Sequence, residues 1–298
     1  MNQLQIILID GIQYAGWLFL VSIGLTLVFG VLRLLNIAHG AFYALGAYVA
    51  AYAIGLAAQN GFGTGVQLLA AFLGAIAVGG LIGVLVERTI LRRLYDHPEV
   101  ITLFATYALF LMMEDITKLV FGGQPLYAFQ PRNAFGMAQV GPLAYPVYDL
   151  LTVAAAVLVA VAVWVVLNRT RTGRCVIAVV NDREMAASMG VNVTAIMVAT
   201  FVAGTALGAF AGAVTAPKIA VAPGIAVEVV VLAFAVIVIG GLGSIGGAVV
   251  GALVVGIARA AATHLAPDFA VFAVYAVMAL VLAVRPYGLF ARPLARKI

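Results

Sequence analysis

The chain has few charged residues. Asp, Glu, Lys and Arg account for 9% of its 298 residues and hydrophobic residues for 65%, and its mean hydropathy is +1.17. Soluble domains carry about 25% charged residues, so this chain does not have the polar side chains to cover its own surface in water. A soluble fold is therefore excluded, and lipid must form part of the solvent. No polar stretch approaches the length of a domain, and we expect a single transmembrane domain over residues 1–298.

Cysteine, histidine and lysine are also scarce, and each scarcity excludes a kind of site. The one cysteine, Cys175, allows neither a disulfide framework nor a thiolate metal cluster. The three histidines are far apart, and no cysteine or carboxylate stands near His39, so the sequence offers no metal site. None of the three lysines belongs to a G-x-x-x-x-G-K-[ST] loop, so we expect no nucleotide or other cofactor in this chain.

Long hydrophobic runs fill most of the chain. A membrane-spanning helix needs about 20 mainly apolar residues, and the runs that come near this length are 6–31, 38–58, 66–86, 100–121, 147–167, 194–216, 226–240, 244–262 and 269–284. The seventh run is short and the first two nearly touch, so we expect about eight to ten membrane segments. The pattern predicts an all-α, polytopic bundle of transmembrane helices.

Basic residues indicate how the bundle is oriented. They gather near the end of the third run, in the stretch 168–192 and in the C-terminal tail: Arg88, Arg92, Arg93, Arg169, Arg171, Arg174, Arg183, Arg285, Arg292, Arg296 and Lys297. The positive-inside rule places these three regions in the cytoplasm. The loops at 122–146 and 217–225 then face outward, with the N-terminus outside and the C-terminus inside.

The cytoplasmic stretch contains a short helix in the sequence NDREMAASMG. Asn181 is suited to be its N-cap, and Glu184, three residues later, completes the spacing of a capping box. Gly190 stands where a glycine ends a helix. The predicted helix is shorter than the roughly 12–15 residues that an isolated helix needs in water.

This short helix has an apolar face. Met185 and Met189 lie on one side of it together with Ala186. Methionine is flexible and common at binding surfaces, so the face is suited to docking against another protein. A helix that lies on the membrane surface of its own chain would show the same pattern, and both interpretations stay open.

A polar cluster interrupts the hydrophobic sequence at RLLNIAHG, where Arg33, Asn36 and His39 are followed by Gly40. Polar groups inside a membrane usually face a bundle interior or a transport path. These four residues are therefore candidates for a translocation path or gate. The alternative is a simple turn at the membrane surface, with Arg33 reaching the lipid head groups.

Glu228 is the only charged residue between Lys218 and Arg259. It is either a carboxylate on a transport path or, more commonly for such a residue, the start of a helix near the outer surface. Glu114 and Lys118 form an i,i+4 pair that marks another outer helix end.

The glycine-rich stretch VIVIGGLGSIGGAVVGALVVG, residues 236–256, first suggests a nucleotide site. It contains G-x-G-x-x-G after a β-branched run, which is the spacing of a dinucleotide-binding turn. That fold also requires a solvated βαβ unit and an acidic residue at the end of a second strand. Here residues 229–262 contain one charge, Arg259, and Asp268 follows a turn. We therefore reject the nucleotide-binding interpretation.

A spacing of four residues explains the glycines better. Small residues at i, i+4 and i+8 let membrane helices approach closely, and this spacing predicts packing faces at Gly204, Gly208, Gly212, Gly243, Gly247 and Gly251.

The residues Gly240, Gly241, Gly243 and Ser244 would break a helix just before the second of these faces. Each half of the chain then carries one interrupted hydrophobic segment, at 33–40 and at 240–244. Such pairs are typical of inverted repeats whose broken helices flank a translocation site. These four residues are therefore further candidates for the path or gate.

Three separated stretches in this order resemble a known family. They are GLTLVFGVLRLLNIAHGAFYALGAY (24–48), GRCVIAVVNDREMAASMGVNV (173–193) and VIGGLGSIGGAVVGA (238–252). Together they resemble the permease subunits of branched-chain amino-acid-type ABC importers, in particular the shorter of the two permeases. The likeness extends over nearly the whole chain.

The resemblance implies a bacterial inner-membrane assembly with a second permease subunit, two cytoplasmic ATPase subunits that hydrolyse ATP, and a periplasmic substrate-binding protein. It implies that residues 181–190 form a coupling helix seated in an ATPase subunit. The expected solute is a branched-chain or other neutral amino acid, and similar importers carry urea and short amides or aromatic acids. The family usually has Pro where Gly246 stands, and glycine there should make the helix break more flexible.

Two other classes of function fit less well. A stand-alone channel or ion-coupled carrier would need ionisable groups inside the membrane, and few are present beyond Arg33, His39 and Glu228. A membrane-embedded enzyme would need a nucleophile with a base beside it, and the sequence offers no such pair. We therefore expect a transport subunit that is not an enzyme and binds no nucleic acid.

Overall fold

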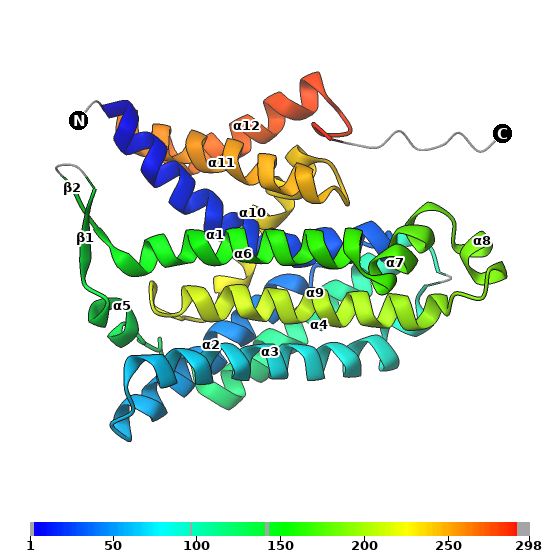
Figure 1. The fold of residues 1–298 in the computed structure, drawn as a ribbon, viewed down its shortest axis with the longest axis horizontal. Helices are drawn as coiled ribbons and strands as arrows, with labels where there is room; N and C mark the ends of the chain where they lie inside the picture. Colours follow the sequence, from blue (N-terminus) through cyan, green and yellow to red (C-terminus); the bar gives the residue numbers. More distant parts are fainter. Residues whose placement is uncertain (1–2, 96, 141–142, 291–298) are drawn as a thin grey trace.

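The computed structural model describes residues 3–95, 97–140 and 143–290, and Figure 1 shows its arrangement. Eight of its helices are long and apolar enough to cross a membrane. They are α1 (Gln3–Leu32), α2 (His39–Gln59), α3 (Thr64–Thr89) with η1 (Leu91–Arg93), α4 (Glu99–Phe121), α6 (Val147–Arg169), α9 (Val193–Thr215), α11 (Ile245–Leu265), and η2 (Pro267–Phe269) with α12 (Ala270–Val284). A ninth apolar helix, α10 (Ile225–Gly240), has 16 residues. The predicted polytopic helical bundle is confirmed.

Smaller elements mark the two ends of the bundle. One end carries α5 (Gln130–Ala134) and an antiparallel hairpin of β1 (Met137–Val140) and β2 (Leu143–Pro146). The opposite end carries α7 (Arg171–Asn181) and α8 (Arg183–Ser188). We call these the hairpin end and the α8 end. The sequence predicted only a loop where α5 and the hairpin lie.

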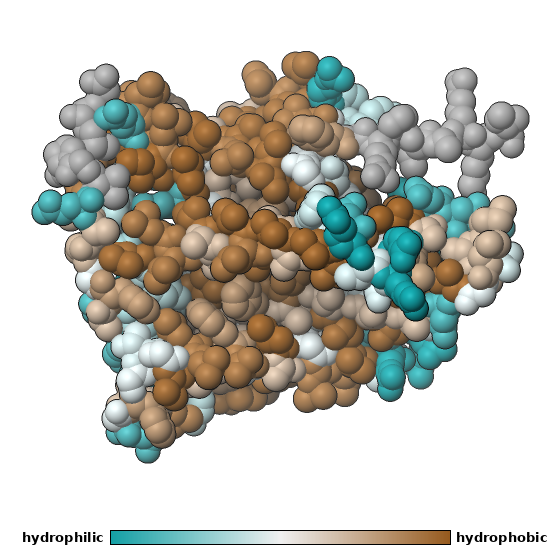
Figure 2. Space-filling model, viewed as in Figure 1, coloured by the Kyte–Doolittle hydropathy of each residue, from teal (hydrophilic) through white to brown (hydrophobic). Residues whose placement is uncertain are grey.

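The Arg-rich segments meet at the α8 end. Arg88 lies in the last turn of α3, Arg169 in the last turn of α6, and Arg171, Arg174 and Arg183 in α7 and α8, and these parts of the four elements lie at the same end of the bundle (Figure 1). Hydrophilic residues gather on this part of the surface (Figure 2). Of the predicted basic tail, Arg292, Arg296 and Lys297 lie outside the described residues.

Helix α1 lies in the middle of the bundle, and the outer helices surround it. Of the most apolar 18-residue window in each helix, 72% is buried in α1 but only 17% in α6 and 6% in the segment of α12. The outer surface is largely hydrophobic (Figure 2), with exposed side chains such as Leu81, Leu158 and Leu280. Apolar side chains that face outward in this way are what lipid requires, so the chain is a multi-pass membrane protein.

Glycines allow the central helices to touch. Gly204 of α9 lies against Gly24 of α1, and Gly212 of α9 lies against the backbone of Tyr43 in α2. In the C-terminal part, Gly247 and Gly251 of α11 face backbone atoms of Gly240 and Val236 in α10. A methyl group at any of these glycines would meet the backbone of the neighbouring helix.

Candidate functional site

The short helix at the α8 end begins one residue later than predicted. Asp182 is its N-cap and accepts a hydrogen bond from Met185 N at 2.9 Å, whereas Asn181 is the last residue of α7. Glu184 is therefore the second residue of the helix, and no capping box with Asn181 forms. Gly190 has a φ of +83°, so it ends the segment in the left-handed conformation that glycine favours.

The two faces of α8 differ in exposure. Met185 is 62% exposed and Met189 78%, so both side chains point away from the bundle. The sequence predicted Ala186 on the same side of the helix as the two methionines. This is wrong, because Ala186 is buried against the bundle. One side of α8 is thus anchored through Ala186, and the exposed side carries the two methionines together with Glu184 and Ser188.

Arg183, the first residue of α8, connects this helix to α1. Its Nη2 atom donates a hydrogen bond to Val31 O at 2.8 Å. Nearby, the Tyr95 hydroxyl donates to Glu87 Oε1 at 3.0 Å. Burial raises the pKa of Tyr95, and the adjacent negative charge of Glu87 raises it further. The Tyr95 hydroxyl therefore keeps its hydrogen at neutral pH and remains a donor to Glu87.

The chain between α1 and α2 is not helical, and its polar residues point in different directions. Arg33 has a φ of +58° and is exposed. Asn36 is fully buried, and neither atom of its side-chain amide has a hydrogen-bond partner among the described residues. Thr106 of α4 supports this turn, because its hydroxyl oxygen lies 3.3 Å from both Leu35 O and Ile37 N.

His39 lies inside the bundle rather than in a surface turn. Its Nε2 atom is 2.9 Å from Val21 O, and because a carbonyl only accepts, Nε2 carries the hydrogen. The ring occupies the space that side chains at Gly24 and Gly208 would need. Gly40 packs against the backbone of Ala226 in α10. Of the polar cluster, Asn36, His39 and Gly40 are therefore buried and Arg33 is exposed, and their assignment to a path or gate stays a prediction.

The second break separates α10 from α11. Gly241 and Gly243 have φ values of +102° and +78°, which favour glycine. Ser244 caps α11, since its Oγ accepts a hydrogen bond from Gly247 N at 3.0 Å. A Cβ atom on Gly243 would lie 2.9 Å from Gly30 Cα, so this break packs against the last turns of α1.

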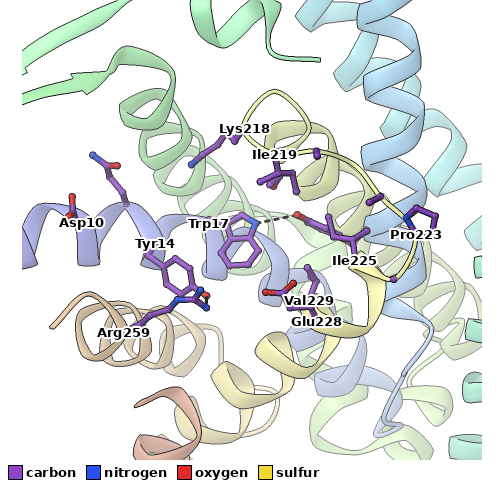
Figure 3. Close-up of a pocket in the computed structure, with 16 residues that line it drawn as sticks. Asp10, Tyr14, Trp17, Lys218, Ile219, Pro223, Ile225, Glu228, Val229 and Arg259 are labelled. Carbon is purple, nitrogen blue, oxygen red and sulfur yellow. Dashed lines mark hydrogen bonds between the residues drawn. The ribbon is translucent and has the colours of Figure 1, made fainter. Parts of the chain in front are cut away.

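A cavity of about 610 Å³ lies toward the hairpin end, between α1, α10, α11 and the connection from α9 to α10 (Figure 3). Trp17, Tyr43, Ile225 and Val229 form much of its wall, and the Trp17 ring N–H lies 3.4 Å from the Tyr43 hydroxyl. Its volume falls within the roughly 300–1,000 Å³ of small-molecule sites.

Four charged side chains line this cavity. Asp10 pairs with His264 at 2.7 Å, and Lys218 pairs with Asp149 at 3.1 Å. The guanidinium of Arg259 lies over the ring of Tyr14, 4.5 Å from its centre, and donates a hydrogen bond to the Tyr14 hydroxyl. The fourth residue is Glu228, in the first turn of α10.

None of the residues predicted for the path or gate lines the cavity. The sequence allowed two interpretations of Glu228, a carboxylate on a transport path or the start of a helix. It gave no reason to select Tyr14 or Arg259. These two residues are 245 positions apart, so no local pattern joins them. The only sequence feature that pointed to Arg259 as a functional residue was its isolated charge within a hydrophobic run.

Comparisons with known proteins agree on one family. The model of the permease component of branched-chain amino acid transport systems matches residues 7–282. The chain is 30% identical over 297 residues to the high-affinity branched-chain amino acid transport system permease protein LivH of Escherichia coli strain K12, with 97% of this chain and 96% of LivH covered. It is also 30% identical to the corresponding protein BraD of Pseudomonas aeruginosa, with coverages of 98% and 97%.

Another relative shares a lower sequence identity with the chain. The chain is 25% identical over 302 residues to the probable branched-chain amino acid transport permease protein LivH of Methanocaldococcus jannaschii, with 96% of this chain and 92% of the relative covered. No solved structure matches the chain.

Proposed function

This chain belongs to the family of permease components of branched-chain amino acid transport systems, and from that premise we propose that it forms half of the membrane path of an ATP-binding-cassette importer. The proposed solute is a branched-chain or other neutral amino acid, in line with the names of the relatives. The chain itself holds no cofactor in this proposal, and partner subunits hydrolyse the ATP.

The proposed assembly assigns a partner to each end of the bundle. The protein spans the bacterial inner membrane with the hairpin end in the periplasm and the C-terminus in the cytoplasm. A second permease subunit lies beside it, two ATPase subunits bind on the cytoplasmic side, and a periplasmic binding protein delivers the solute. Arginines in the last turns of α3 and α6 and in α7 and α8 support this orientation through the positive-inside rule.

The exposed methionine pair of α8 is the observation that carries the proposal. Helix α8 lies at the far end of the molecule, beyond the bundle helices (Figure 1), so the exposed Met185 and Met189 lie outside the apolar belt. A six-residue helix is not stable alone, and here its Ala186 side anchors it to the bundle. A rigid, projecting helix with a flexible apolar face is suited to sit in a groove of another protein.

The contacts of α8 also suggest how movement reaches the membrane. Arg183 bonds to the last turn of α1, next to the turn that holds Arg33 and Asn36. The break at Gly241 and Gly243 packs against the same part of α1. We expect displacement of α8 to shift both breaks, with His39, Gly40, Gly240 and Ser244 in the moving region.

Replacement of the methionines tests the proposal. Met185→Asp with Met189→Asp should prevent co-purification of the ATPase subunits with the permease pair, because two carboxylates cannot be buried in an apolar groove. Met137→Asp is the matched control: Met137 is 66% exposed, but it lies in β1 at the hairpin end. Retention of the ATPase subunits by the α8 variant would contradict the proposal.

A further inference from the structure

The charges in the cavity near the hairpin end are not all neutralised by the chain. Lys218 pairs with the carboxylate of Asp149, and Asp10 is within hydrogen-bond distance of His264, as described above. Within the described residues, Glu228 has no cationic group within 4 Å and Arg259 has no carboxylate within 4 Å. One negative and one positive group therefore line the cavity without a counter-charge from the protein.

These two groups are directed at the same space. Figure 3 shows the carboxylate of Glu228 turned toward the side of the cavity where Arg259 and Tyr14 lie. Arg259 uses one nitrogen for the hydroxyl of Tyr14, and the guanidinium has five N–H donors, so donors remain for a carboxylate. The contact of Arg259 with the Tyr14 ring holds the guanidinium in place.

Part of the remaining wall is apolar, and Asp10, Gln13 and Lys218 are among its other polar residues. Trp17, Ile225 and Val229 border the cavity beside the two charges. An occupant that fits all these features carries one positive group, one negative group and an apolar body. A separated carboxylate and guanidinium in apolar surroundings bind such a molecule through charge-assisted hydrogen bonds.

We propose that this cavity binds the zwitterion of an amino acid with an apolar side chain, with Glu228 contacting the α-ammonium group and Arg259 the α-carboxylate. Trp17, Ile225 and Val229 contact the side chain. The inference rests on the proposed transport function and adds to it a point in the permease at which the solute itself is recognised.

Binding measurements with three probes test this assignment. The assembled complex of permease and ATPase subunits, without the binding protein, is titrated with leucine, with 4-methylpentanoate, which lacks the ammonium group, and with 3-methylbutylamine, which lacks the carboxylate. The unmodified complex should prefer leucine to either analogue by about ten-fold or more, as expected for one charge-assisted hydrogen bond.

Each variant should lose one kind of discrimination. Glu228→Gln should weaken leucine binding about ten-fold and leave the binding of 4-methylpentanoate unchanged, whereas Arg259→Gln should weaken leucine binding and leave that of 3-methylbutylamine unchanged. Arg259→Lys keeps the charge and should retain part of the affinity for leucine. A distorted cavity would weaken all three probes alike, and that result would overturn the assignment.

Asp115→Asn is the control, because this carboxylate pairs with Lys118 on α4 and does not line the cavity. It should leave all three affinities unchanged. If the ATPase subunits bind but leucine shows no saturable binding, the assignment fails while the importer proposal stands. If no ATPase subunit associates, the same titration is made on the purified permease chain, and a crossed pattern there means that the cavity assignment stands and the importer proposal fails.

Discussion

Arg183 is the residue that most directly joins α8 to the membrane bundle. Val31 is next to the last residue of α1, and its carbonyl is one of the four at a helix end that lack a partner within the helix. Arg183 provides the missing partner, since its Nη2 atom donates a hydrogen bond to Val31 O at 2.8 Å. Its positive charge is also favourable at the C-terminal end of a helix. A neutral side chain at this position would loosen α8 from α1 without altering the methionine face.

We predict that Arg183→Gln uncouples ATP hydrolysis from transport. The ATPase subunits should still bind, but the amount of leucine transported per ATP hydrolysed should fall, because a hydrogen bond to a charged group contributes about 1.5–3 kcal/mol. Uptake and phosphate release measured on the same proteoliposomes give this ratio. Arg174→Gln, which removes an exposed charge on α7, should keep the normal ratio. An unchanged ratio for Arg183→Gln would show that the contact with Val31 transmits nothing.

At the level of the elements, two adjacent glycines at the start of α11 have different surroundings. Gly246 is exposed, and a Cβ atom there would have no heavy atom within 4 Å. Gly247 is buried and faces the carbonyl of Gly240 across the break. Only the second glycine is required by packing. Proline, which the family resemblance leads us to expect at position 246, is compatible with the first turn of a helix.

We predict opposite effects of alanine at these two positions. Gly246→Ala should raise the stability of the protein by up to about 1 kcal/mol, because alanine restricts the unfolded chain more than glycine does. Gly247→Ala should lower it by about 1–3 kcal/mol, because the methyl group is forced into the α10 backbone. Thermal unfolding of the purified complex in detergent measures both. Equal melting temperatures for the two variants would contradict this account of the break.

The helices themselves were predictable to different degrees. All the hydrophobic runs except the short seventh one contained enough apolar residues to span a membrane. Each run corresponds to a helix, and the short seventh run corresponds to the 16-residue α10. The start of α8 was misplaced because Asn181 and Asp182 are both good N-caps, and the helix α7 before them uses Asn181. The hairpin of β1 and β2 was missed because its four-residue strands are too short to show an alternating pattern.

At the scale of the whole molecule, the cavity could not be predicted because it is formed by residues that are distant in sequence. Tyr14 and Arg259 come together only when α1 packs on α11, and Lys218 finds its partner Asp149 on α6. The buried position of His39 likewise depends on glycines of α1 and α9. The hydrophobic pattern indicates where the membrane segments lie in the sequence, but it does not indicate which of them pack against each other.

The central claim is that this chain transports a neutral amino acid only with ATPase partners. The most direct measurement is the accumulation of radiolabelled leucine in proteoliposomes that contain the chain alone or with the second permease, the ATPase subunits and the binding protein. We predict accumulation only in the full assembly and only with ATP on the side of the ATPase subunits. Leucine accumulation by the chain alone, or by the full assembly without ATP, would contradict the claim.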